Sequence, residues 1–225
     1  MTSASRSGKN QASAAAAKTA TKSARRRGRP PAGDESGLRH EIVAASARLF
    51  RTQGYERTSV RDIAAAVGIQ SGSWFYHFKS KQEILLAVMS EGLAKATADI
   101  EAIATEDLAP RERFRKLVAA HLATLVMPGN DFVPVTLYEW RSLDADAVRT
   151  VAGLTQRYED VWDKVLADLQ ASGDWARPTA LDRLLMFGAM NWTVQWYRAR
   201  GQASLEQLVE ATMQFLLRTP EPAPR

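Results

Sequence analysis

The side chains that could do chemistry in this sequence favour binding over catalysis. The three histidines, His40, His77 and His121, are far apart in the sequence, and there is no cysteine to act as a nucleophile or a thiolate ligand. The sequence also lacks the metalloprotease, phosphate-loop, dinucleotide-binding and serine-nucleophile motifs. We therefore expect no enzyme activity, no catalytic residues and no metal or cofactor site.

One run, IQSGSWFYHFKSKQEIL (residues 69–85), concentrates hydroxyl, amide, imidazole and ammonium groups. Groups of this kind hydrogen-bond to base edges and to phosphates. At the start of a helix, the small residues Ser71, Gly72 and Ser73 would let the helix N-terminus come close to DNA, where its dipole favours phosphate. The run therefore indicates nucleic-acid binding.

Helices must position this run. Apolar residues repeat with helical period over residues 38–50 and again over residues 60–67, and each series ends at a glycine. The short helices, the tight turn at Gly68 and the run that follows have the spacing of a helix-turn-helix. Ser80, three residues before Glu83, predicts a capping box that opens a third helical run.

Charge is unevenly distributed along the chain. Residues 1–33 carry eight Lys and Arg and no acidic residue, whereas residues 84–225 carry fifteen basic and nineteen acidic residues. Residues 2–36 contain no Val, Ile, Leu, Phe, Tyr or Trp, so we expect residues 1–36 to be a disordered basic tail. The basic front half predicts a polyanionic partner.

The rest of the chain is predicted to be helical, which makes the fold all-α. Helical periods run through residues 114–126, 151–169 and 205–216, while residues 184–196 are apolar nearly all round. Residues 132–138 have a strand-like period, but we expect a helix because nothing else is available to pair with a strand. No apolar stretch is long enough to cross a membrane, so we expect a cytoplasmic, nucleoid-associated protein.

Residues 39–85, RHEIVAASARLFRTQGYERTSVRDIAAAVGIQSGSWFYHFKSKQEIL, resemble the DNA-binding domain of the TetR family of bacterial repressors. The resemblance rests on the spacing of Gly54, Tyr55, Thr58, Ile63, Ala64, Gly68, Gly72, His77, Phe78, Lys81 and Leu85. It implies that Arg61 faces a base edge from the second helix. It also implies a reading surface on the third helix made of Gln70, Ser71, Ser73 and Trp74, and phosphate contacts from Thr58, Tyr76, His77 and Lys81.

Two positions depart from the family pattern. Phe75 stands where the family usually has tyrosine, and we expect its ring to pack in the core. Gln70 stands where a serine commonly caps the recognition helix, and Ser71 is expected to take over that role. His77 could also be a structural histidine. Lys81, in the first turn of its helix, opposes the helix dipole, which an anionic partner would explain.

The tail holds a second candidate for DNA contact, RRRGRPP (residues 25–31), which is similar to an AT-hook. The resemblance implies that an extended segment lies in the minor groove, where narrow A·T-rich tracts concentrate negative potential. The contacts would come from Arg25, Arg26, Arg27 and Arg29. The alternative is a solvated run of charge that adds only non-specific affinity.

The resemblance further implies a three-helix DNA-binding domain at residues 37–83 and a helical ligand-binding and dimerisation domain at residues 84–225. The homodimer interface is expected on the helices Leu184–Trp196 and Leu205–Leu216, where Gly188 and Ala189 permit close approach. Polar and aromatic side chains on apolar faces are expected to line one effector cavity. They are His121, Tyr138, Trp140, Arg141, Asn191, Trp192, Gln195 and Trp196.

These inferences predict a repressor that binds a palindromic operator as a homodimer and is released by a small effector. The run MFGAMNWTVQWYRARGQASLEQL (residues 186–208) is similar to that of members that respond to acyl-CoA thioesters of lipid or sterol degradation. Arg141, Arg198 and Arg200 would meet the phosphates of such an effector. Two alternatives remain open: a multidrug-type member of the family, and a nucleoid-architectural protein that binds DNA through the tail.

Overall fold

The structure is a computed structural model, and it describes residues 32–175, 180–201 and 203–217. Within these residues it contains helices and no strand, which confirms the all-α prediction. The helices are α1 (Ala32–Gln53), α2 (Val60–Val67), α3 (Lys81–Ala104), α4 (Pro110–Val126), α5 (Phe132–Glu139), α6 (Ala145–Ala171), α7 (Ala180–Trp196) and α8 (Leu205–Leu216), with 3-10 turns η1 (Ser73–Tyr76) and η2 (Trp140–Ser142). None of these helices is long and apolar enough to cross a membrane.

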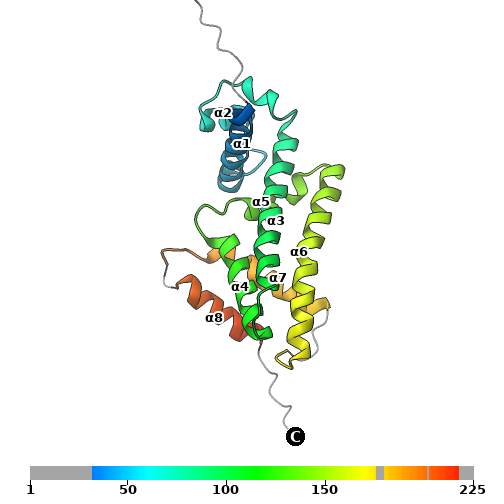
Figure 1. Ribbon diagram of the computed structural model, residues 1–225. Coiled ribbons are helices and arrows are strands. Elements are labelled where there is room, and N and C mark those ends of the chain that lie inside the picture. Colours follow the sequence, from blue (N-terminus) through cyan, green and yellow to red (C-terminus); the bar gives the residue numbers. More distant parts are fainter. Residues whose placement is uncertain (1–31, 176–179, 202, 218–225) are drawn as a thin grey trace, which may run out of the picture.

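The elements form two groups along one long axis. Figure 1 shows α1, α2 and the short turn η1 at one end, while α4, α6, α7 and α8 make up the other end. The helix α3 runs from the first group into the second. The segment with a strand-like period is the helix α5, as predicted, and it lies between the two groups beside α3.

The helix α1 begins earlier than the sequence predicts. It starts at Ala32, so the last five residues of the expected tail, residues 32–36, are helical. The prediction was wrong there because a run of small and polar residues can extend a helix that is anchored by apolar residues further on. The other residues of the expected tail, residues 1–31 with their four arginines, lie outside the described residues.

Local capping fixes the ends of the short helix α2. The Ser59 side chain accepts a hydrogen bond from the Asp62 backbone N–H, and the Asp62 carboxylate accepts from the Ser59 N–H, which is a complete capping box. Gly68 ends α2 with φ of 77°, a left-handed conformation that favours glycine. At α3, the predicted box is half formed, because Glu83 accepts from the Lys79 N–H instead of the Ser80 N–H.

Two apolar cores stabilise the molecule, and α3 belongs to both. Its first half packs with α1, α2 and η1 through residues such as Ile84 and Leu85, and its second half packs with α4 and α6 through Ala96 and Ile100. The predicted boundary between residues 83 and 84 therefore falls near the start of a continuous helix. Val135 of α5 also enters the first core, so the two groups are joined by packed side chains.

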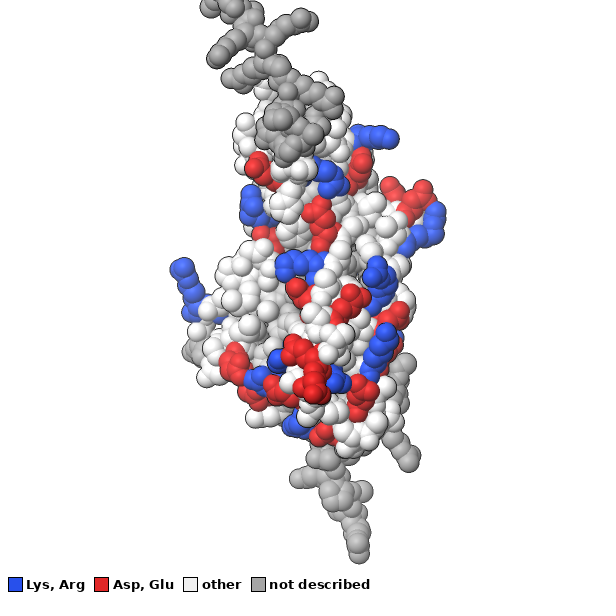
Figure 2. All heavy atoms as spheres, viewed as in Figure 1, with Lys and Arg blue, Asp and Glu red and all other residues white. Residues whose placement is uncertain are grey.

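Many charged side chains of the described residues have partners of opposite sign. Figure 2 shows acidic and basic side chains interspersed, with both signs gathered near the end of the molecule where α4 and α8 lie. There, Arg115 of α4 binds Glu206 and Glu210 of α8, with a distance of 2.7 Å between Arg115 Nε and Glu210 Oε1. These exposed pairs hold α8 in register along α4 more than they add stability.

The contact between α3 and α5 depends on Gly92. A Cβ atom at Gly92 would lie 2.6 Å from Phe132 Cβ, a separation that real structures essentially never show. We expect Gly92→Ala to lower the free energy of unfolding by about 1–3 kcal/mol, because α3 and α5 must move apart. Denaturant unfolding measures this change.

Gly153 provides the matched control. It lies in α6, and a Cβ atom there would meet nothing within 4 Å. Gly153→Ala should therefore keep or raise stability, by up to about 1 kcal/mol from helix propensity. If Gly92→Ala were as stable as Gly153→Ala, the close approach of α3 and α5 would not exist.

Candidate DNA-binding surface and effector cavities

The expected recognition helix is shorter than the sequence predicts. A turn at Ser71 and Gly72 leads into the four-residue 3-10 helix η1, and Gly72 occupies the N-cap position without any side-chain cap. The prediction that Ser71 caps this helix was therefore wrong, since the helix begins one residue too late for Ser71 to reach it. The helix η1 ends where the Trp74 carbonyl accepts hydrogen bonds from the backbone N–H groups of His77 and Phe78.

The tight winding of η1 decides which aromatic rings face solvent. Trp74 is 4% exposed and packs in the first core, whereas Phe75 is 62% exposed and Tyr76 is 90% exposed. The Phe75 ring stacks on the Trp74 ring with centroids 4.0 Å apart. Both predictions for this pair were wrong. Trp74, which was predicted to contact DNA, packs in the core, and Phe75, which was predicted to pack in the core, lies on the exposed surface above it.

Two predicted phosphate contacts are engaged within the protein. Thr58 is 1% exposed, and its hydroxyl donates to the Gly54 carbonyl at 2.8 Å, so the prediction of a phosphate contact there was wrong. Lys81 Nζ donates to the carbonyls of Tyr55 (2.9 Å) and Thr58 (3.1 Å) and lies 4.0 Å from the centroid of the Tyr55 ring. Lys81 therefore fastens the α1–α2 connection to α3, which explains a cation in the first turn of that helix.

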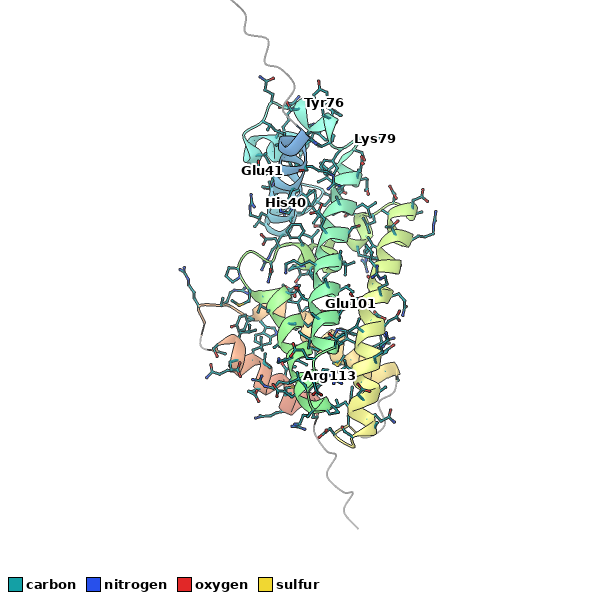
Figure 3. The ribbon with its side chains drawn as sticks, in the orientation of Figure 1. His40, Glu41, Tyr76, Lys79, Glu101 and Arg113 are labelled. Carbon is teal, nitrogen blue, oxygen red and sulfur yellow. The ribbon has the colours of Figure 1, made fainter. Side chains whose placement is uncertain are left out.

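The remaining predicted DNA contacts are accessible. Arg61, Gln70, Ser71 and Tyr76 are exposed, and Ser73 and His77 are half-buried. Figure 3 shows Tyr76 at the end of the molecule formed by the first group of helices, away from α4 and α6. Together with Phe75, these residues present hydroxyl, amide, guanidinium, imidazole and aromatic groups on one end.

The C-terminal core contains a buried polar cluster centred on His121. His121 is 6% exposed; its Nδ1 lies 2.8 Å from the Tyr158 hydroxyl and its Nε2 lies 3.0 Å from Asn191 Oδ1. Because Asn191 Oδ1 only accepts, Nε2 carries the proton and Nδ1 accepts from the Tyr158 hydroxyl. The rings of Trp162 and Phe187 lie 5.8 and 5.5 Å from the imidazole.

Burial keeps this cluster uncharged. Loss of solvent lowers the pKa of His121 to about 4, although the hydrogen bond to Asn191 opposes the shift. Burial also raises the pKa of Tyr158. Both groups are therefore neutral, and they hydrogen-bond to each other inside an aromatic box.

The predicted effector residues do not line a single cavity, so that prediction was wrong. His121 meets Asn191 in the core, whereas Gln195 Nε2 donates to the Tyr138 hydroxyl at 2.6 Å in a hollow near α1. The other four are exposed because they lie on the outer face of α7 or in η2: Trp192 (65%), Trp196 (54%), Trp140 (39%) and Arg141.

Sequence reasoning missed Tyr158, Trp162 and Phe187. Tyr158 and Trp162 are one helical turn apart on the buried face of α6, which is a signal that the sequence does contain. That His121 lies opposite them depends on how α4 packs against α6, and no local pattern encodes this packing.

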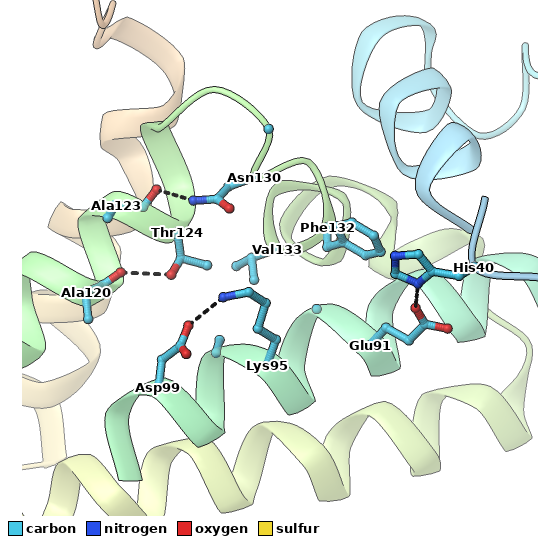
Figure 4. Close-up of a pocket in the computed structure, with 13 residues that line it drawn as sticks. His40, Glu91, Lys95, Asp99, Ala120, Ala123, Thr124, Asn130, Phe132 and Val133 are labelled. Carbon is cyan, nitrogen blue, oxygen red and sulfur yellow. Dashed lines mark hydrogen bonds and ion pairs between the residues drawn. The ribbon is translucent and has the colours of Figure 1, made fainter. Parts of the chain in front are cut away.

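An open groove of about 540 Å³ lies between α1, α3, α4 and α5. In Figure 4, the Lys95 side chain projects from α3 into the groove and turns toward Asp99 of the same helix, and small side chains such as those of Ala120 and Ala123 form part of the wall. Its polar groups pair with each other: Lys95 Nζ lies 2.9 Å from Asp99, and His40 Nδ1 lies 3.5 Å from Glu91. The groove therefore offers mainly apolar surface.

Family models match both halves of the chain. Residues 42–88 match the model "Bacterial regulatory proteins, tetR family", and residues 107–219 match "Tetracyclin repressor-like, C-terminal domain". The chain belongs to the TetR family. It is a DNA-binding transcriptional regulator, and the first match covers the helix-turn-helix built by most of α1, α2, η1 and the start of α3.

One curated relative is named as a transcriptional repressor, and two solved structures share the fold. The transcriptional repressor KstR2 of Rhodococcus jostii is 28% identical over 196 residues, which cover 84% of this chain and 95% of KstR2. The crystal structure of the superantigen PfiT is similar with a TM-score of 0.70 and 40% identity, covering 83% of this chain and all of PfiT. AibR in complex with isovaleryl coenzyme A and operator DNA has the same fold, with a TM-score of 0.73, 21% identity, and coverage of 80% and 98%.

The buried His121 makes stability depend on pH in this TetR-family protein. In the unfolded chain, histidine protonates near pH 6.5, while folded His121 stays neutral down to about pH 4. Its contribution to stability is therefore complete above pH 6.5 and is lost as the pH falls towards 4. We expect the free energy of unfolding to drop by up to about 1.4 kcal/mol per pH unit in this window.

Chemical unfolding of wild type and His121→Gln between pH 5 and 7 measures this slope. The variant should lack the His121 part of the slope, whereas His40→Gln, at a side chain that is 73% exposed, should keep it. Equal slopes in wild type and His121→Gln would show that the imidazole is not buried in its neutral form.

Proposed function

We propose that this protein represses transcription by binding a palindromic operator as a homodimer, and that a small effector releases it. The observation that carries the proposal is the end of the helix-turn-helix, where Arg61, Gln70 and Phe75 stand clear of the core in a chain of the TetR family. A regulator of this family acts through binding, so the proposal includes no catalysis. It acts at the chromosome, in the cytoplasm.

The exposed residues divide into two kinds of DNA contact. Arg61, Gln70, Ser71 and Ser73 carry donors and acceptors suited to base edges, and the Phe75 ring can contact the methyl group of thymine. Tyr76 and His77 are suited to phosphates, which fix register without reading sequence. Arg25, Arg26, Arg27 and Arg29 of the tail are proposed minor-groove contacts, and they lie outside the described residues.

The proposed dimer interface follows from a stripe of exposed apolar side chains along α7. Residues of this helix at spacings of three and four are exposed: Leu181 (68%), Leu184 (60%), Leu185 (70%), Gly188, Ala189, Trp192 (65%) and Trp196 (54%). Phe215 of α8 is also exposed, at 56%. Aromatic and aliphatic side chains in one patch of this kind mark an interface between proteins.

The effector is proposed to enter the aromatic box around His121, where Asn191 and Tyr158 would orient its polar group. An acyl-CoA thioester fits this proposal, because its carbonyl is neutral and its chain is apolar, and AibR, which has the same fold, binds isovaleryl coenzyme A. The multidrug alternative needs a carboxylate that is free to meet a cation. Glu139 lies in the wall of a hollow and accepts hydrogen bonds only from neutral donors, the Tyr55 N–H and the Ser142 hydroxyl, so this alternative stays open.

DNA binding tests the repressor function. We expect the full chain to bind one palindromic fragment flanking its own gene at physiological salt, at least about a thousandfold more tightly than random DNA. A long-chain acyl-CoA should release the fragment. Equal affinity for all fragments would support the architectural alternative instead, and that binding would depend on residues 1–33.

Substitutions at Phe75 and Trp74 test DNA recognition and folding stability separately. Phe75→Ala should weaken operator binding about tenfold, a loss of about 1.4 kcal/mol, and lower the unfolding free energy by no more than about 0.5–1.5 kcal/mol, the value of its stack on Trp74. Phe75→Tyr keeps the ring and should retain binding. Trp74→Ala should lower the unfolding free energy by about 3–5 kcal/mol, because it opens a cavity in the first core. If both alanine variants lost stability equally, Phe75 would be a core residue.

Light scattering after size-exclusion chromatography tests the dimer. Leu185→Glu places a charge in the centre of the α7 stripe and should yield monomers, since an unpaired charge cannot be buried cheaply at an apolar interface. Leu137→Glu is the matched control, because Leu137 is an exposed leucine of α5 outside the stripe. A dimer that persisted in Leu185→Glu would place the interface elsewhere.

A further inference from the structure

The connection between α1 and α2 is held through the backbone of one residue, Tyr55. Its N–H donates to Glu139 Oε1 at 3.0 Å, and its carbonyl accepts from Lys81 Nζ at 2.9 Å. Tyr55 is 5% exposed, and its ring centroid lies 5.3 Å from that of Phe50 in the first core. Both backbone groups of Tyr55 are thus bonded to charged side chains, and such hydrogen bonds are stronger than those between neutral groups.

The two charged partners of Tyr55 come from different parts of the structure. Lys81 begins α3 and also donates to the Thr58 carbonyl, so its contacts stay within the DNA-binding end. Glu139 ends α5, which continues through η2 into α6 of the second group of helices. The hydrogen bond from Tyr55 to Glu139 therefore joins the α1–α2 connection to the C-terminal half.

Glu139 is itself held in place. Its other oxygen, Oε2, accepts from the Ser142 hydroxyl in η2 at 3.1 Å. Gln82 of α3 binds the segment around Ser142, because its Nε2 donates to the Ser142 carbonyl at 2.5 Å and its Oε1 accepts from the Asp144 N–H at 3.4 Å. The Glu139 carboxylate therefore meets Tyr55 from a fixed direction.

A second contact, at the start of α5, makes the position of Glu139 important. Asp131 lies 2.9 Å from Arg51 of α1. Asp131 and Glu139 flank the eight residues of α5, a length of about 12 Å at about 1.5 Å per residue. The apolar contact of Val135 lies between them, and apolar contacts are not directional. One polar contact would let α1 turn about it, whereas two contacts this far apart fix its direction.

We propose that Glu139 is a positioning residue for operator binding, which sets the angle of the helix-turn-helix relative to the C-terminal half. The inference rests on the dimeric operator binding proposed above, and it names the side chain that gives the two reading surfaces of a dimer their spacing. Without the Glu139 carboxylate, Lys81 and the first core keep the helix-turn-helix folded, but its angle varies. Glu139 thus acts on DNA binding without touching DNA.

The distance between two spin labels tests this angle directly. The chain contains no cysteine, so Ala66→Cys in α2 and Ala152→Cys in α6, both at exposed positions, give two unique labelling sites. We expect a narrow distance distribution with Glu139 in place and a distribution about twice as wide in Glu139→Ala, because more orientations are populated. Diluting labelled with unlabelled chains restricts the measurement to distances within one protomer.

Three further variants isolate the hydrogen bond. In Glu139→Gln, the amide oxygen can accept from the Tyr55 N–H and the amide nitrogen can donate to the Ser142 hydroxyl, so the distribution should stay narrow. Glu139→Asp keeps the charge on a side chain that is one methylene shorter; it should widen the distribution, and it replaces Glu139→Ala if that variant does not fold. The matched control is Glu101→Gln, at an exposed glutamate of α3 that pairs with Arg157. It should behave as wild type does.

The preferred spacing of the operator half-sites is a readout that a loss of stability alone does not change. One base pair inserted at the centre of the palindromic fragment moves the half-sites apart by about 3.4 Å and turns them by about 35°. We expect wild type and Glu139→Gln to bind the longer fragment at least about tenfold more weakly than the original one. Glu139→Ala should lose most of this preference.

Each outcome decides the inference. Equal widths in wild type, Glu139→Ala and Glu139→Asp would overturn it, as would a wider distribution with an unchanged spacing preference. If the distribution widens but the wild-type chain binds no specific operator, the role of Glu139 in setting the angle stands and the repressor function fails. If a specific operator is bound while the distribution does not widen, the repressor function stands and the inference fails.

Discussion

The structure depends on one helix that belongs to two cores. Because α3 contributes Ile84 and Leu85 to the first core and Ala96 and Ile100 to the second, neither group of helices can reorient without bending or shifting it. The absence of a side chain at Gly92 lets α5 approach α3 at the point between these two sets of contacts. The orientation of the DNA-binding end is therefore set by apolar packing within the C-terminal half.

Polar contacts at the two ends of α5 reinforce this coupling. Glu139 at the end of α5 holds the Tyr55 N–H, and Asp131 at its start holds Arg51 of α1. Both ends of α5 therefore bind residues of the first group of helices, at the DNA-binding end. A displacement of α5 would therefore move both contacts together, which couples the position of this helix to the DNA-binding end.

Much of the fold could be predicted from the sequence, because each helix carries its own apolar period and end signals. Gly68 and Ser80 mark ends that the structure has, and α5 is a helix in a structure whose described residues include no strand for it to pair with. The side-chain roles were harder to predict. Trp74 is buried and Phe75 is exposed, which is the reverse of the prediction. The tight turn begins one residue later than expected, and this shift rotates every side chain that follows. The effector residues failed for another reason: which residues of α4, α6 and α7 meet is a property of packing between distant segments.

The alternation of buried and exposed rings in η1 has a consequence for how such a regulator can diverge. Trp74 and Phe78 anchor the turn, while Gln70, Ser71 and Tyr76 are exposed and Phe75 is exposed on one side and stacks on Trp74 with the other. Substitutions at the projecting positions alter which base edges are met and leave the packing beneath them intact. A gene duplicate could therefore acquire a new operator in single steps without passing through an unstable intermediate, provided that the two anchoring rings are kept.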